Sequence, residues 1–99
     1  MAGDKVIVEN VNVPGQTSRL DKAKYDAMRD ALLNTLPVGR DNSMTVKGAL
    51  ATLRIMLPED LFPGGKTSGW WQKTVQLDLE AKGLVGRTDD KPMRIFRIG

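Results

Sequence analysis

The sequence predicts an α+β domain in which three helices lead into a C-terminal β-hairpin, preceded by an N-terminal strand or extended arm. Two observations predict this class. Apolar residues recur at helical spacing in three segments between residues 22 and 82. After Gly83, two short apolar stretches flank the turn sequence Asp-Asp-Lys-Pro, as in a β-hairpin. We therefore divide the chain into an extended arm at 1–20 and a helical domain with its hairpin at 21–99.

The arm is expected to be extended because β-branched side chains dominate residues 5–13, KVIVENVNV. Pro14 and Gly15 then favour a turn. The first helix is expected next, at about 22–36, with Asp21 as its N-cap.

Each of the first two helices has one apolar face. Tyr25, Met28 and Leu32 recur at helical spacing in the first helix, which predicts that they lie in the core. The second helix is expected at about 44–57, where Leu50 and Leu53 are predicted core residues. It is expected to begin at the N-cap Ser43 and to end before Pro58.

Two features interrupt this regular pattern. Gly48 lies within the second helix and costs up to ~1 kcal/mol relative to alanine, so we expect it to allow another backbone segment to come close. Residues 58–69 form the longest irregular stretch, in which Leu61 and Phe62 are expected to enter the core.

The third helix is expected at about 69–82, with Gly83 in the left-handed conformation that ends it. At 100° per residue, Trp71, Val75 and Leu79 fall on one face, which is the predicted core side.

A second apolar stripe runs along the same helix. Trp70, Leu77 and Ala81 lie nearly opposite the core face. We expect the N-terminal arm or the loop at 58–68 to cover this stripe, because both are intramolecular and carry apolar residues. The alternative is that the stripe binds a protein partner or a second copy of the chain.

The residue types present exclude several functional classes. Cys and His are absent, so we expect neither disulfides nor a transition-metal site with thiolate or imidazole ligands. The carboxylate pairs at 59–60 and 89–90 lack the spaced oxygen ligands that Mg²⁺ or Ca²⁺ needs. The stretch GGKTSG has Asp60 in place of the first glycine of a phosphate-binding loop. We therefore predict no catalytic residue, no metal, no cofactor and no enzymatic activity.

The net charge of +3 and a pI near 9.5 suit a nucleic acid partner without requiring one. No apolar run is long enough to span a membrane and no secretory signal is apparent, so a cytoplasmic protein is expected. The C-terminal hairpin contains two acidic residues and four basic ones: Arg87, Lys91, Arg94 and Arg97. Two interpretations stay open, namely contacts to phosphates and protection of an edge strand from aggregation.

The string Leu-Glu-Ala-Lys-Gly-Leu-Val at 79–85 resembles the passage from recognition helix to wing in the winged helix-turn-helix superfamily. This resemblance covers roughly residues 21–98. The whole chain also resembles a family of small uncharacterised bacterial proteins that share stretches such as VNVPG, LPEDLFPGG and WWQKTVQLDLEAKG.

The winged-helix resemblance implies that the third helix is a recognition helix, with Gln72, Lys73 and Gln76 near base edges. The connection between the second and third helices departs from the superfamily pattern. It spans about eleven residues, at 58–68, instead of three or four, so the reading geometry is expected to differ.

Two functions follow as hypotheses. The first is a small DNA-binding or transcription-associated protein that binds weakly, with little sequence preference and strong salt dependence, through the hairpin arginines and the third helix. The second is a protein-interaction module that uses Trp70 and Leu77. We favour the first because DNA binding is common for this fold.

Overall fold

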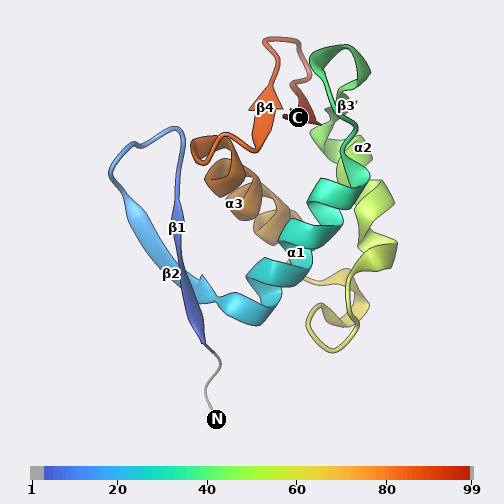
Figure 1. The fold of residues 1–99 in the computed structure, drawn as a ribbon. Helices are drawn as coiled ribbons and strands as arrows, with labels where there is room; N and C mark the ends of the chain where they lie inside the picture. The colour runs from blue at the N-terminus through green and yellow to red at the C-terminus, as the bar shows by residue number, and fades with distance from the viewer. Residues whose placement is uncertain (1–3, 99) are drawn as a thin grey trace.

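Three α-helices form the centre of the structure, a computed structural model that describes residues 4–98. They are α1 (Lys22–Thr35), α2 (Val46–Leu53) and α3 (Ser68–Ala81). Two small antiparallel sheets accompany them, which confirms the predicted α+β class. Figure 1 shows α3 between the N-terminal hairpin on one side and α1 on the other. Residues 1–3 of the predicted arm and residue 99 lie outside the described residues.

The N-terminal sheet is a hairpin of β1 (Lys5–Glu9) and β2 (Thr17–Asp21). The prediction of one extended segment at 5–13 was incomplete, because the strand ends at Glu9 and the following valines lie in the turn. Val8 is buried in the core, whereas Ile7 on the opposite face is exposed. This alternation places one face of the hairpin against α3.

The second sheet contains β3 (Met44–Thr45), β4 (Val85–Arg87) and β5 (Arg94–Arg97) in the order β3-β5-β4. The predicted C-terminal hairpin is thus confirmed, and β3 adds a third strand. The central strand β5 also reaches the segment after α1, since the Arg97 amide donates to the Pro37 carbonyl at 2.8 Å. The sheet therefore joins the chain after α3 to both ends of the α1–α2 connection.

The start of α2 differs from the prediction. Ser43 is not its N-cap, because Met44 and Thr45 pair with β5, a partner distant in sequence. The hydroxyl of Thr45 caps the helix instead and accepts from the Gly48 amide at 3.0 Å. A Cβ on Gly48 would stand 2.9 Å from this hydroxyl oxygen, so the capping side chain, and not another backbone segment, accounts for the glycine. The helix ends at Leu53 and continues as the short 3₁₀ helix η2 (Arg54–Met56).

The core lies where α1, α2 and α3 meet. Seven of the eight predicted core residues are buried: Tyr25, Met28, Leu32, Leu53, Trp71, Val75 and Leu79. The exception is Leu50, which is only partly buried, because its side chain lines a pocket beside α3. Phe62 is buried as expected, and its ring meets Trp71 edge-on with centroids 6.3 Å apart.

The predicted N-cap of α1 and the predicted glycine at the end of α3 are both confirmed. The Asp21 carboxylate caps α1 by accepting from the Ala23 amide at 3.1 Å. Gly83, just beyond the end of α3, has a φ of 76°, which an L side chain rarely adopts. The chain reverses there and enters β4, so the hairpin of β4 and β5 stands beside α3.

Candidate functional site

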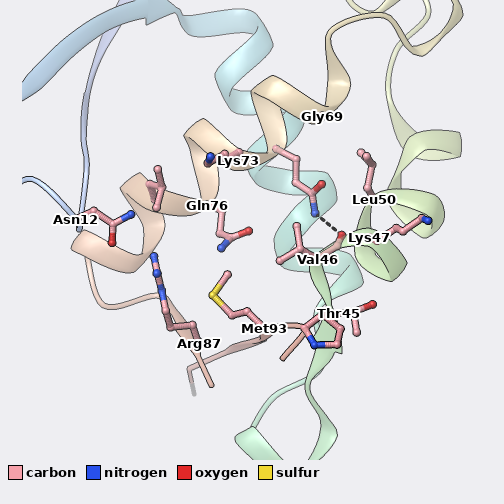
Figure 2. A pocket seen from close by; sticks show the side chains of 13 residues that line it. Asn12, Thr45, Val46, Lys47, Leu50, Gly69, Lys73, Gln76, Arg87 and Met93 are labelled. Carbon is pink, nitrogen blue, oxygen red and sulfur yellow. Dashed lines mark hydrogen bonds between the residues drawn. The ribbon is translucent and has the colours of Figure 1, made fainter. Parts of the chain in front are cut away.

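A pocket of about 630 Å³ lies between the start of α2, one side of α3 and the β4–β5 hairpin (Figure 2). Asn12, in the turn of the β1–β2 hairpin, borders one end of it. The wall is mostly apolar and contains Val46, Leu50, Leu77, Pro92 and Met93. None of the described residues that line it is acidic, whereas Lys47, Lys73 and Arg87 are basic.

Gln72, predicted to lie near base edges, is held in the wall of this pocket. Its side chain is 1% exposed, and its amide nitrogen donates to the Val46 carbonyl oxygen at 3.1 Å (Figure 2). This hydrogen bond ties α3 to the first turn of α2. In this arrangement the amide serves packing between the two helices and does not project to solvent.

Gln76, the second glutamine predicted to lie near base edges, is also buried, with 3% exposure. Its amide nitrogen donates to Glu80 Oε2 at 3.1 Å, one turn further along α3. Its carbonyl oxygen is buried and has no hydrogen-bond partner among the described residues. Figure 2 shows the side chain extending from α3 toward Met93 across the pocket. An unpartnered buried acceptor is uncommon in folded proteins.

Arg87, predicted as a phosphate contact, forms a two-pronged ion pair with Glu80. One guanidinium nitrogen, Nη2, donates to Glu80 Oε2 at 2.8 Å, and Nε donates to Oε1. The hydrogen bond to Glu80 raises the pKa of the Arg87 guanidinium. This pair fastens β4 to the end of α3 and sets a carboxylate against the arginine's charge.

Arg94 is likewise engaged within the protein. Its guanidinium donates to the Ser43 hydroxyl at 3.2 Å and to the Ser43 carbonyl oxygen, which ties β5 to the residue before β3. The other predicted contact residues, Lys73, Lys91 and Arg97, are exposed. The structure thus separates the seven predicted nucleic-acid contacts into four that hold the fold together and three that face solvent.

The apolar stripe on α3 is only partly covered. Trp70 is 55% exposed and packs edge-on against Trp71, with ring centroids 5.2 Å apart. Leu77 is partly buried because the β1–β2 hairpin runs beside it, while Ala81 is exposed. The expected cover by the N-terminal arm therefore reaches the middle of the stripe and leaves the tryptophan in solvent.

A buried carboxylate fixes that hairpin to α3. Asp78 is fully buried and accepts from the Glu9 amide at 2.8 Å, from the Tyr25 hydroxyl and from the Lys82 ammonium at 2.5 and 2.6 Å. Burial, followed by the hydrogen bond to Asp78, raises the pKa of Tyr25 well above its usual value. No local pattern in the sequence indicates this role, because Glu9 and Tyr25 come from elements distant in sequence.

The pocket walls contributed by α2 and by the β1–β2 turn were not predicted from the sequence. One signal for the pocket was present in Gly69, which occupies the first turn of α3. A Cβ built there meets only Leu50 Cδ2, at 3.8 Å, so the position opens onto the pocket. Glycine is a poor helix former, and its presence on a helix surface is a sign of open or closely approached space.

The remaining predictions concern metals and membranes. Among residues 4–98, no group of three or more acidic, histidine or cysteine side chains is arranged to hold a metal ion. In the same part of the chain, no helix has the length and apolar character needed to cross a bilayer.

Comparison with known proteins gives one match. No curated protein and no solved structure matches the chain. The model of a family of unknown function, DUF6958, matches residues 5–95, which agrees with the predicted resemblance to an uncharacterised family. The match runs from the start of β1 into the first half of β5 and so includes every residue that lines the pocket. The chain belongs to this family, DUF6958.

Proposed function

We propose that this chain is a small winged-helix-like protein, without catalytic activity, that binds duplex DNA weakly through the phosphate backbone. The order α1-β3-α2-α3-β4-β5, with β5 between β3 and β4, supports a winged-helix assignment. In such an arrangement α3 faces the duplex and the β4–β5 hairpin is the wing. A cytoplasmic location follows from a role on DNA.

The observation that carries this proposal is the charge of the groove between α2, α3 and the wing. Lys47 from α2 and Lys73 from α3 line the same pocket, and no acidic side chain joins them among the described lining residues, whereas the charge of Arg87 from β4 is paired with Glu80. Lys91 adds an exposed charge in the turn of the wing. Cations from three elements around one groove suit a polyanion whose phosphates are spread over several ångströms.

Binding is proposed to be sequence-tolerant because the side chains best suited to base edges are buried. Gln72 and Gln76 donate their amide hydrogens to Val46 and Glu80, so neither offers a two-pronged contact to an adenine. Contacts from lysines to phosphates position a duplex without distinguishing its bases.

The experiment is fluorescence anisotropy with a labelled duplex of random sequence at several salt concentrations. Replacing both Lys47 and Lys73 with Ala is expected to weaken binding and to make the slope of log K against log salt shallower by about 1–2, at roughly 0.9 per lost phosphate contact. The matched control replaces Lys5 and Arg19 with Ala. These substitutions remove the same amount of charge from exposed positions on the N-terminal hairpin. A folded Lys47/Lys73 variant with the affinity and salt slope of the control would overturn the proposal.

A second candidate function is self-association through α3, and the exposure of Trp70 favours it. A large aromatic side chain that is more than half exposed is a frequent anchor of protein interfaces. A second copy offers the same surface and pairs with it by two-fold symmetry. Sedimentation over a wide concentration range tests this: an average mass that rises with concentration, and no longer does so in Trp70→Ala, supports a homodimer. A monomer at every concentration overturns it.

A further inference from the structure

We propose that the pocket between α2, α3 and the β4–β5 hairpin binds a small amphipathic acid, with an apolar body, one N–H or O–H donor and one anionic group. This inference does not depend on DNA binding. The volume of about 630 Å³ lies within the usual range of roughly 300–1,000 Å³ for small-molecule sites. Three features of the wall specify the three parts of the ligand.

The donor is specified by Gln76, a residue of the pocket wall whose buried carbonyl oxygen has no hydrogen-bond partner among residues 4–98. Its orientation is fixed from behind. Arg87 holds the Glu80 carboxylate with two hydrogen bonds, and Glu80 Oε2 in turn accepts from the Gln76 amide nitrogen. Turning the amide over would set its oxygen against the carboxylate oxygen, two acceptors at hydrogen-bond distance. The chain Arg87–Glu80–Gln76 therefore presents an acceptor, and only a ligand donor complements it.

The apolar body is specified by the side chains around this oxygen. Val46 and Leu50 from α2, Leu77 from α3 and Met93 from the wing contribute aliphatic surface. Figure 2 shows Met93 beside Gln76, and its unbranched thioether adapts to ligands of different shape. Gly69 leaves the wall without a side chain on the α3 side, which gives a flat ring room to enter.

The anionic group is specified by Lys73 and Lys47 in the pocket wall. Both lysines are exposed, and within residues 4–98 neither forms an ion pair. Arg87, in contrast, forms an ion pair with Glu80. No acidic side chain lines the pocket among the described residues to oppose a carboxylate. Figure 2 shows the two lysines on opposite sides of the pocket, so the ligand has its carboxylate near one of them, in solvent, and its donor at depth near the glutamine.

The first experiment is a ¹H–¹⁵N NMR titration of the whole chain, without DNA, using three probes. Indole-3-acetate carries a ring, an N–H donor and a carboxylate; N-methylindole-3-acetate lacks the donor, and indole-3-acetamide lacks the charge. Indole-3-acetate is expected to shift the backbone amides of residues 45–50 and 69–77. N-methylation is expected to weaken binding about tenfold, the effect of one buried hydrogen bond. Equal affinity for the indole and its N-methyl form, or shifts confined to lysine amides, would overturn the proposal.

Variants test the site itself. Gly69→Phe places a ring in the pocket and is expected to abolish binding of indole-3-acetate, while Gly69→Ala keeps it. Gln76→Met preserves side-chain length and removes the acceptor, so this variant is expected to bind the indole and N-methyl probes equally. A Gln76→Met variant that still prefers the indole would refute the assigned role of Gln76, whether or not Gly69→Phe folds. Each outcome is read from protein and probe alone, so a failure here is independent of a failure to bind DNA.

Discussion

Replacing Asp78 with Ala is expected to lower the free energy of unfolding by about 3–5 kcal/mol. The carboxylate is fully buried and joins the N-terminal hairpin, α1 and α3. A hydrogen bond to a charged group contributes roughly 1.5–3 kcal/mol. The bonds from the Glu9 amide and the Tyr25 hydroxyl at the lower end of that range give about 3–4 kcal/mol. Lys82 is partly exposed and regains water, so its contribution is at most about 1 kcal/mol.

The assay is urea unfolding followed by tryptophan fluorescence, which reports on the buried Trp71. The expected loss is a large part of the roughly 5–15 kcal/mol that stabilises a domain of this size. Lys82→Ala is the comparison variant: it removes the counter-ion but keeps the Glu9 and Tyr25 hydrogen bonds to the carboxylate, so it is expected to cost less than Asp78→Ala. Asp78→Asn keeps an acceptor and is expected to fall between the two, with faster hydrogen exchange of the Glu9 amide than in the wild type. An Asp78→Ala protein within 1 kcal/mol of wild type would refute this account of how the hairpin is held.

Three further predictions concern the core, the β4–β5 hairpin and the stability of the fold at alkaline pH. Leu79→Ala is expected to cost about 2–5 kcal/mol in the same urea assay because the side chain is fully buried, and a cost near zero would contradict its place in the core. Gly86→Ala sets a Cβ 2.5 Å from the Phe96 ring and is expected to cost about 1–3 kcal/mol; an unchanged melting temperature would mean that the ring moves freely. The raised pKa of Tyr25 keeps this phenol neutral in the folded protein while the unfolded chain ionises near pH 10, so stability is complete below pH 10 and falls as pH rises above it. Tyr25→Phe is expected to flatten that fall between about pH 10 and 12, and because the chain has a single tyrosine, absorbance titration of the wild type checks the cause directly.

Helices were predictable wherever one apolar face repeats over several turns. The period of three and four residues in α1 and α3 is a local property, and it also separated the buried Trp71 from the exposed Trp70. The strands were less predictable because pairing decides them. The segment Thr17–Asp21 is polar and becomes a strand only beside β1, and Met44 and Thr45 become one only beside β5. No local pattern in these residues specifies those partners.

The candidate site was predictable in chemistry and not in geometry. Helical phase places Gln72 and Gln76 away from the core face of α3, and from phase alone they face solvent. In the structure, α2 and the β4–β5 hairpin close over that side, and both amides lie in the pocket wall. The pairing of Glu80 with Arg87 had one sequence signal, since opposite charges flank the Gly83 reversal that brings the helix end and the strand together.

The order of strands β3-β5-β4 has a consequence for synthesis on the ribosome. Ser43, just before β3, and Arg94, at the start of β5, are joined by hydrogen bonds although they are 51 residues apart. At a synthesis rate of about 5–20 residues per second, β5 is made roughly 3–10 s after Ser43 at the α2 side of the groove. The two strands of the N-terminal hairpin, in contrast, both lie within residues 5–21. The groove between α2, α3 and the β4–β5 hairpin is thus completed only when β5 has been made.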